Sequence, residues 1–416
     1  MALPRPLRQG LAWGLSTLGP GLGRFFDRDP RLPRASNILV IHPGGVGDWI
    51  ELTPMLRALW EGLPEATLIA LHDPRQRSLD LVRGLGFLSG EIPFDRTGRD
   101  RSPAAKMRLL WRLRARRFDL ALVPLMGPGM IECVLMAFLS GARQRIGIEQ
   151  EGAGLLFTVK VPRQAHLSAT EHNLELARAL GLRPRRAAAE ISLRPEELRF
   201  GQRFWEAHAQ PAGRPRVAFH PGAQWAARLR CWPASRFAAL GRALVAQTGS
   251  PIALLGGPSE RATCAQIASA LGEDNLVNMC AQTTLGQAAG QIAAAHLLVA
   301  NDSGLMHVAR ATGTPCVAVF GPSSPVVRAL PEIPHRIVRQ SLPCVPCHQE
   351  RPFVMPDCLH ARCLRTLPVQ QVLEACLELL EATGRGRSPP PAHSRQTPDV
   401  ATPDTVGGGP RPCVAR

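Results

Sequence analysis

Apolar and polar residues follow two patterns along this chain, one typical of buried strands and one typical of amphipathic helices. In the first half, short apolar runs bounded by glycine, proline or polar residues predict strands at 38–41, 67–71 and 120–124. Between these runs, apolar residues recur every three or four positions. This spacing predicts a helix that starts at Pro54 with Thr53 as its cap, and further helices at 104–117, 130–140 and 196–208.

The second half repeats the same alternation more regularly. It predicts strands at 217–220, 252–255, 276–279, 297–300 and 316–320. The predicted helices lie at 235–247, 260–271, 285–295, 305–312 and 369–382. Strands separated by helices indicate parallel sheets, and 416 residues suffice for two domains of this α/β class.

Changes in composition suggest where the domains begin and end. We expect a flexible basic arm at 1–35, a first domain at 36–195, a linker helix and loop at 196–215, a second domain at 216–366, a closing helix at 367–383 and a tail at 384–416. The tail is rich in proline, glycine, serine and threonine without apolar periodicity, so it is predicted to be disordered.

Two segments, 37–48 and 297–307, each predict a buried strand that runs into a glycine-containing turn and the start of a helix. In open α/β sheets, phosphates and catalytic groups lie at such junctions, because the free N–H groups of the helix start point at the ligand. Two junctions of this kind suggest two domains that face one cleft, which would hold a phosphorylated donor against an acceptor.

The net charge of +16 favours anionic partners. The positive charge is almost all arginine, since Lys106 and Lys160 are the only lysines, and such a bias is also typical of a GC-rich genome. Aromatic residues make up 5% of the chain and do not alternate with the basic runs, as a surface for single-stranded nucleic acid would require. We therefore expect no nucleic-acid partner.

No convincing secretory or membrane-spanning segment is present in the sequence. Pro20 interrupts the weakly apolar stretch 10–23, and prolines and glycines split 120–142 into pieces too short to cross a bilayer. We expect a cytoplasmic protein, with an anchor on a membrane surface as the alternative for the arm. A basic helix is expected to present a solvated face or to meet anionic lipid or a phosphorylated acceptor; its basic residues are Lys106, Arg108, Arg112, Arg116 and Arg117.

Four motif blocks, taken together and in order, resemble glycosyltransferase family 9, the bacterial lipopolysaccharide heptosyltransferases. The blocks are His42–Asp48 with Leu52–Pro54; His220–Trp225 with Arg228, Arg230, Trp232 and Pro233; Leu255–Glu260; and Asn301–His307 with Gly313–Pro315 and Phe320–Pro322. The resemblance runs from about residue 37 to residue 380.

The resemblance implies the GT-B architecture, in which two Rossmann-like domains with parallel sheets face a central cleft. It implies that the first domain binds the acceptor and the second binds an ADP-activated heptose, and that transfer inverts the anomeric configuration. The acceptor would be a phosphorylated glycolipid of the lipopolysaccharide inner core, at the cytoplasmic face of the inner membrane. We further expect a monomer, no cofactor beyond the nucleotide sugar, and a closing helix that packs back on the first domain.

Sugar transfer from a nucleotide diphosphate requires a base for the acceptor hydroxyl and groups that absorb the charge of the leaving diphosphate. By position alone, Asp48 is either a helix cap or such a base. The resemblance implies the base, because the family's catalytic aspartate occupies this position. Gly44, Gly45 and Gly47 would form the loop on the acceptor side.

The donor site would gather residues of the second domain. Ser303 and Gly304 begin a helix whose N–H groups could stabilise the leaving oxygen, and His307 lies one turn further on. Asp302 is a further candidate of this group. Either Arg228 or Arg230 would neutralise the diphosphate, and Glu260 would accept hydrogen bonds from the ribose hydroxyls. Each residue also has a purely structural alternative. Asp302 and Ser303 could cap the helix, and His307 could be a core histidine. Arg228 and Arg230 could be a solvated charge pair, and Glu260 an exposed acid in a first helical turn.

No metal is required by this scheme, and Asp27-Arg28-Asp29 is regarded as a chance match. Four cysteines in a polar loop, however, have spacing that suits either a structural zinc site or loop thiols that are reduced or occasionally disulfide-linked: Cys344, Cys347, Cys358 and Cys363, with His348 and His360 among them.

Two other functions remain open from the residues alone. Gly45-Val46-Gly47 with Asp73 fits part of the fingerprint of a nucleotide-dependent Rossmann oxidoreductase, but Ile50 stands where its third glycine belongs. A non-enzymatic protein that binds anionic surfaces would account for the charge and would bind in a strongly salt-dependent way.

Overall fold

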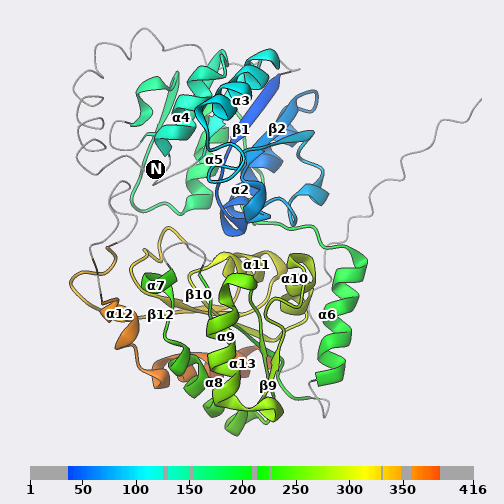
Figure 1. Cartoon of the computed structure of the whole chain (residues 1–416), viewed down its shortest axis with the longest axis vertical. Helices are drawn as coiled ribbons and strands as arrows, with labels where there is room; N and C mark the ends of the chain where they lie inside the picture. Colours follow the sequence, from blue (N-terminus) through cyan, green and yellow to red (C-terminus); the bar gives the residue numbers. More distant parts are fainter. Residues whose placement is uncertain are drawn as a thin grey trace, which may run out of the picture.

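A computed structural model describes residues 36–124, 130–149, 153–208, 213–223, 227–328, 331–347, 358 and 360–384. They form two α/β lobes stacked along the long axis of the molecule (Figure 1). Each lobe is built on one six-stranded sheet, and every strand pair within both sheets is parallel. The expected fold class, two Rossmann-like domains with parallel sheets, is confirmed.

Both sheets are wound in the same order. The first has the order β3-β2-β1-β4-β5-β6, and the second has β12-β11-β10-β7-β8-β9. The first set spans β1 (Asn37–Ile41), β2 (Thr67–His72), β3 (Gly90–Pro93), β4 (Leu120–Val123), β5 (Gln144–Glu149) and β6 (Val159–Pro162). The second spans β7 (Val217–His220), β8 (Ile252–Leu254), β9 (Leu276–Asn278), β10 (Leu297–Asn301), β11 (Cys316–Phe320) and β12 (His335–Arg339).

The winding direction reverses between β1 and β4 in the first sheet and between β7 and β10 in the second. Ligands of open α/β sheets bind outside the carboxyl ends of the strands at such points. The segments after β1, β7 and β10 are therefore where the fold places a ligand site.

Helices cover both faces of each sheet. In the first lobe, α2 (Val46–Gly62) and α5 (Ala169–Ala179) contribute to the core on one face, and α3 (Pro103–Ala115) and α4 (Met130–Leu139) to the core on the other. The second lobe carries α6 (Pro195–His208), α7 (Ala227–Arg230), α8 (Ala234–Thr248), α9 (Arg261–Leu271), α10 (Leu285–Ala293), α11 (Gly304–Thr312), α12 (Arg362–Arg365) and α13 (Val369–Gly384). Short 3₁₀ turns η1 to η5 span 74–76, 83–85, 153–156, 258–260 and 273–275.

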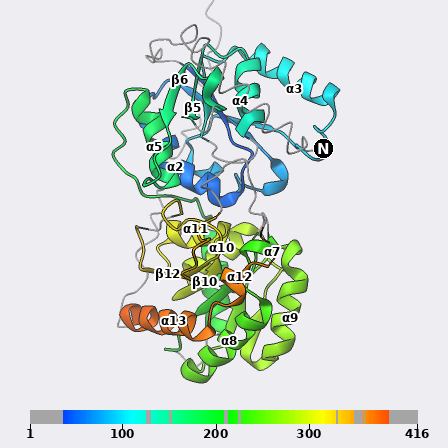
Figure 2. The same cartoon turned by 90° about the vertical axis from the view of Figure 1, so that its left-hand side faces the viewer.

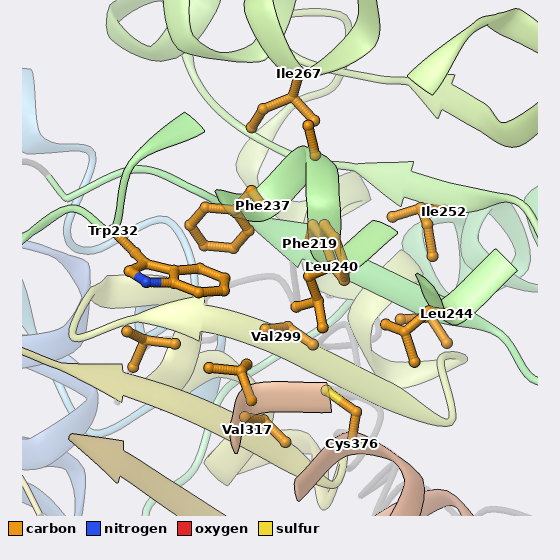
Figure 3. Close-up of a cluster of buried hydrophobic side chains, with 14 of the residues drawn as sticks. Phe219, Trp232, Phe237, Leu240, Leu244, Ile252, Ile267, Val299, Val317 and Cys376 are labelled. Atoms are coloured by element: carbon orange, nitrogen blue, oxygen red, sulfur yellow. The ribbon is translucent and has the colours of Figure 1, made fainter. Parts of the chain in front are cut away.

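The core of the second lobe is built around aromatic residues. Phe219 of β7 packs edge-on against Phe237 of α8, which in turn contacts Trp232 in the same way (Figure 3). All three are almost fully buried, together with apolar residues of β8, β10 and β11. This packing holds the segment 231–233, and with it the loop that follows β7, against the sheet.

The closing helix does not pack as expected. Instead of returning to the first domain, α13 lies against α8 and the strands β10, β11 and β12 of the second lobe (Figures 1 and 2). The physical reason is its apolar face, since Val372, Leu373, Cys376 and Leu379 are buried in the core of the second sheet. The predicted arm at 1–35 and the tail beyond Gly384 lie outside the described residues.

The expected linker helix is also part of the second lobe. α6 packs on α10, where a Cβ atom on Gly201 would lie 2.0 Å from the carbonyl oxygen of Gly290. Because Gly201 and Gly290 have no side chains, the two helix backbones can touch here. The crossing between lobes is instead made by the chain before α6, where the Glu190 amide donates to the hydroxyl of Thr53 at 2.9 Å.

Helix α2 begins at Val46, so the expected start at Pro54 is wrong, and Pro54 lies inside the helix. A proline at this position has no N–H for the carbonyl of Ile50. The hydroxyl of Thr53 donates to that carbonyl at 2.7 Å and thereby replaces the missing donor. The helix can therefore continue through Pro54 and run back to the glycine turn after β1.

The two lobes contact each other directly. α11 of the second lobe packs against α2 of the first (Figure 1). The Ala169 amide at the start of α5 donates to the carbonyl of Val327 at 2.9 Å, and Arg310 of α11 donates to the hydroxyl of Thr170 at 2.9 Å. These contacts bring the segment after β1 next to the segment after β10, where a Cβ atom on Gly47 would lie 3.2 Å from Cα of Gly304.

Candidate active site

Asp48 lies in the first turn of α2. Gly45 is the N-cap residue, and its amide donates to Oδ2 of Asp48 at 2.9 Å. The side chain of Asp48 keeps 33% of its exposure, whereas its neighbour Trp49 is fully buried and donates its indole N–H to the carbonyl of His42 at 3.0 Å. Asp48 is thus a helix cap and also the accessible carboxylate of the turn.

Two glycines make the space around Asp48. A Cβ atom on Gly44 would lie 2.7 Å from Oδ2 of Asp48 and 2.9 Å from Nε2 of His42. A Cβ atom on Gly47 would lie 2.7 Å from Cδ2 of His307, which belongs to the other lobe. The loop glycines at 44 and 47 therefore allow the start of α2 to approach the start of α11.

Arg328 joins the lobes at this point. It follows β11 in the second lobe, and its Nη1 lies 3.3 Å from Oδ1 of Asp48 and in closer contact with Oε2 of Glu51. Glu51 is one helical turn after Asp48 and is buried. A single guanidinium from the second lobe therefore bridges two carboxylates of the first.

The environment acts differently on the two acids. Burial works to raise the pKa of Asp48, but Arg328, His42 and the Gly45 amide outweigh it, and the pKa is held below its ordinary value. At Glu51, burial dominates over the opposing charge of Arg328, and the pKa rises to about 7. Asp48 is accordingly the ionised carboxylate of the pair at neutral pH.

His307 faces this pair from α11. Its Nε2 lies 3.8 Å from Oε1 of Glu51, and burial, with Arg328 and Arg310 nearby, lowers the pKa of His307 to about 3. The imidazole is therefore neutral at pH 7, and the contact with Glu51 is not an ion pair. Within the described residues, Nδ1 of His307 is buried and has no hydrogen-bond partner.

The start of α11 is held by residues from two other strands. Ser303 is its N-cap residue, but its hydroxyl lies 2.9 Å from Nδ1 of His220 at the end of β7 instead of capping the helix. Asn301 at the end of β10 donates to the carbonyl of Pro221 at 2.7 Å and accepts from the Trp232 amide at 3.0 Å. The N–H groups at the helix start thus remain directed at the cleft.

Arg230 and Asp302 form an ion pair beneath this helix. Nη2 of Arg230 lies 2.7 Å from Oδ2 of Asp302 and donates to the carbonyl of the same residue at 2.7 Å. Burial works to raise the pKa of Asp302, but Arg230 and Arg328 lower it to about 2. Arg230 therefore lies beside the start of α11 with its charge already paired. Arg228 belongs to α7, and its side chain lies outside the described residues.

Glu260 lies at the edge of the second lobe. Its carboxylate accepts from the Gly257 amide at 2.7 Å and from the Ser259 hydroxyl at 2.6 Å. Its Cγ would be 2.5 Å from a Cβ atom on Gly222, which places Glu260 next to the loop after β7. This position fits either the expected contact with ribose or a first-turn acid.

The sequence-predicted residues fall into two groups that face each other. Asp48 and the loop glycines come from the first lobe, and Asp302, Ser303, Gly304 and His307 from the second. Glu51, Arg328, His42 and His220 also line this region but were not among the predicted site residues. Glu51 could have been found as a lone charge in the apolar run Trp49–Leu52, whereas no local pattern marks Arg328.

Other candidates are not supported as sites. Asp73, proposed as a ribose-binding acid, accepts from the Arg75 amide at 3.0 Å and pairs with its guanidinium. No cluster of three or more histidine, cysteine or acidic residues within the described ranges is arranged to hold a metal ion. Of the four cysteines considered for zinc, Cys344, Cys358 and Cys363 form no disulfide there, and His348 lies outside those ranges. None of the described helices combines the length and hydropathy needed to span a bilayer.

Comparison with known proteins identifies relatives of this chain. Residues 106–354 match the family model of Glycosyltransferase family 9 (heptosyltransferase). Lipopolysaccharide heptosyltransferase 2 of Escherichia coli strain K12 is 30% identical over 297 residues, which cover 69% of this chain and 83% of the relative.

Solved structures agree with the fold. The structure of Escherichia coli ADP-heptose lipopolysaccharide heptosyltransferase II superposes with a TM-score of 0.62 at 26% identity, covering 83% of this chain and 99% of the other. An Escherichia coli heptosyltransferase with ADP gives a TM-score of 0.59 at 17% identity, covering 84% and 99%, and a family 9 glycosyltransferase from Veillonella parvula gives 0.67 at 19%, covering 85% and 100%. At these lower identities the likeness concerns the fold.

Proposed function

This chain belongs to glycosyltransferase family 9, the heptosyltransferases, and we propose that it transfers a heptose from an ADP-activated donor to an inner-core hydroxyl of lipopolysaccharide with inversion. The observation that carries the proposal is the position of Asp48. Its partly exposed carboxylate stands on the first lobe, opposite the start of α11 on the second. An inverting transfer requires one carboxylate on the side of the sugar away from the leaving group.

In this mechanism the acceptor oxygen attacks the anomeric carbon of the heptose. Asp48 takes the proton from the acceptor hydroxyl, the new C–O bond forms, and the bond between the anomeric carbon and the diphosphate oxygen breaks. The electrons of that bond leave with ADP. The low pKa of Asp48 keeps it ionised and ready to accept the proton, although it makes the carboxylate a weak base.

The departing diphosphate would be met by the N–H groups at Ser303 and Gly304. These groups face the cleft because the Ser303 side chain is held by His220, and one well-directed donor is worth ~3 kcal/mol in such sites. The neutral His307 can donate a further hydrogen bond without adding a charge. Glu260, beside the loop after β7, is proposed to accept from the ribose.

The acceptor must compete with Arg328 for Asp48. Arg328 also contacts Glu51, so it retains a carboxylate partner when Asp48 turns to the acceptor hydroxyl. Release of Asp48 from the guanidinium would raise its pKa and make it a stronger base at the moment of transfer. We therefore assign Arg328 and Glu51 to positioning Asp48, and Asp48 alone to the proton transfer.

The proposed partners follow from the same scheme. The donor would be the ADP-heptose named for the Escherichia coli relative, and the acceptor a phosphorylated glycolipid at the cytoplasmic face of the inner membrane. The scheme uses no cofactor besides the nucleotide sugar. Because every group it invokes comes from one chain, we propose that the enzyme acts as a monomer.

The test is product analysis. Purified protein is incubated with ADP-L-glycero-D-manno-heptose and with inner-core acceptors that end in Kdo or in a first heptose. Mass spectrometry is expected to show the mass of one added heptose, and NMR of the product an inverted anomeric centre. Asp48→Asn should bind donor and lose turnover. Transfer by that variant at the wild-type rate, or retention of the anomeric configuration, would contradict the mechanism.

A further inference from the structure

The exposed apolar side chains of this chain are not evenly distributed. Seven large apolar residues are exposed within the described ranges, and five of them lie on α3 and α4 of the first lobe. These five are Met107, Trp111, Leu135, Phe138 and Leu139. Trp111 is 71% exposed, the highest value of the seven. Neither the proposed chemistry nor the fold requires these residues to be apolar.

On α3, the apolar pair stands opposite the buried face. Ala105, Leu109 and Leu113 point into the core, and residues follow one another by about 100° around a helix. Met107 and Trp111 therefore project away from the sheet, where a helix facing water normally carries polar residues. Their neighbours Arg108 and Arg112 are exposed as well.

On α4, the apolar surface continues. Glu132 is its only charged residue, and a helix that is apolar all round is normally buried on all sides. Here Leu135 is 46% and Phe138 38% exposed. Glu132 pairs with Lys106 of α3 at 2.7 Å and thereby fixes the two helices to each other. Figure 2 shows α3 and α4 on the outside of the upper lobe.

We propose that this surface, the α3/α4 face (Met107, Arg108, Trp111, Arg112, Leu135 and Phe138), docks on an anionic lipid bilayer. The inference rests on the proposed function, which places the acceptor in a membrane. α3 contains basic residues but no acidic residue, so the charge of Arg108 and Arg112 is not balanced within the helix. Apolar side chains flanked by arginines are typical of elements that insert into the interface of anionic membranes.

The charge argues against the other obvious occupant, a second copy of this chain. Pairing two copies through this face would bring the same arginines together, in proteins that each carry a net charge of +16. In an anionic bilayer, by contrast, lipid phosphates can bind the arginines, and the Trp111 ring can lie at the boundary of the acyl chains. The occupant that fits both parts of the face is therefore the lipid surface.

The experiment measures co-sedimentation of the full chain with vesicles of phosphatidylethanolamine and phosphatidylglycerol, with phosphatidylcholine vesicles as the neutral comparison. We expect binding to the anionic vesicles that weakens as salt is raised. The paired change Trp111→Asp with Leu135→Asp, and separately Arg108→Glu with Arg112→Glu, should each weaken binding at least about tenfold. Trp60→Asp, and Arg199→Glu with Arg203→Glu on α6, alter similarly exposed residues elsewhere and should leave it unchanged.

A second readout separates this inference from the proposed function. The α3/α4 variants should transfer heptose to a deacylated, water-soluble acceptor at the wild-type rate, and should lose activity only on acceptor embedded in vesicles. If wild-type protein binds vesicles but transfers to neither acceptor, the proposed function fails and the docking face stands. If the variants bind vesicles like wild type, the docking face is overturned.

Two further results would also overturn it. A doubled mass in light scattering that the α3/α4 variants abolish would show that a second copy covers the face. A clearly lower melting temperature in the single variant Trp111→Asp would show that the face is buried by the chain itself, since polar substitutions on a truly exposed surface change stability little.

Discussion

The guanidinium of Arg328 in the second lobe lies 3.3 Å from the carboxylate of Asp48 in the first, and it also contacts Glu51. The acid proposed as the catalytic base is therefore paired, across the cleft, with a cation that holds its pKa down. This relationship links the closure of the lobes to the basicity of one side chain, and its consequences can be measured.

Replacing Arg328 with methionine should change the pH dependence of transfer. Asp48 would lose the cation that depresses its pKa, while His42, His307, Glu51 and the Gly45 amide remain around it. The pKa of Asp48 then rises, and the acid limb of the kcat/KM profile should move to higher pH by about one unit. Arg328→Lys should restore most of the wild-type profile. An acid limb that does not move would show that Asp48 and Arg328 are not coupled.

Glu51→Gln should change how stability depends on pH. In the folded protein the pKa of Glu51 is about 7, above its ordinary value of 4.5. Its contribution to stability is therefore full below pH 4.5 and is lost as the pH rises through 7. The loss is roughly 3 kcal/mol at most, and the glutamine variant should not show it. Melting temperatures across this range measure the difference. Glu196→Gln, at a carboxylate that is 55% exposed, should retain the wild-type slope.

Gly47→Ala should impair transfer without unfolding the protein. The added methyl group would lie 2.7 Å from Cδ2 of His307 and 3.2 Å from Cα of Gly304, so α2 and α11 could not approach as closely. A displacement of this kind can cost on the order of 10²-fold in kcat/KM. Steady-state kinetics with circular dichroism separate the two effects. Gly90→Ala meets only the flexible end of Ile69 and serves as the control; equal losses in both variants would exclude an effect of lobe approach.

Thr53→Val should destabilise the first lobe. The Thr53 hydroxyl donates to the carbonyl of Ile50, for which Pro54 has no N–H donor. The same hydroxyl accepts from the Glu190 amide. Both partners would be left unsatisfied in a buried position, at a cost of about 1–3 kcal/mol. Denaturant unfolding measures this cost. Thr366→Val removes a comparable but exposed bond to Arg362, and its effect should be small; an equally small effect at Thr53 would show that the bond is dispensable.

Much of the fold could be predicted because its central strands are buried on both sides. β7 and β11 lie at the predicted residues, since an apolar run of that length between turn residues has few alternatives. The missed strands, β3, β5, β6 and β12, carry weaker patterns. β3 contains Gly90 and Pro93, and β12 alternates exposed charges with half-buried residues at a sheet edge. An edge strand forms because it pairs with a neighbouring strand, and its own sequence does not indicate that pairing.

The site could be predicted to the extent that it consists of strand ends. Asp48, Ser303 and His307 follow buried strands, and parallel sheets bring such ends to one edge. Thr53 and Pro54 misled the prediction of α2, because a cap-like pair lies inside the helix and is stabilised by a tertiary contact with Glu190. Arg328 comes from a turn with no regular pattern. Its role depends on the approach of the other lobe, which the local sequence does not encode.

The indole of Trp49, bonded to the carbonyl of His42 beside Asp48, gives this protein a convenient optical property. The chain has seven tryptophans and no tyrosine, so its near-ultraviolet emission comes from indole alone. The indole of Trp232, by contrast, donates to the carbonyl of Leu367 and is buried in the core of the second lobe. Ligand titrations followed by intrinsic fluorescence, compared between wild type and Trp49→Phe, should isolate the response of the indole beside Asp48.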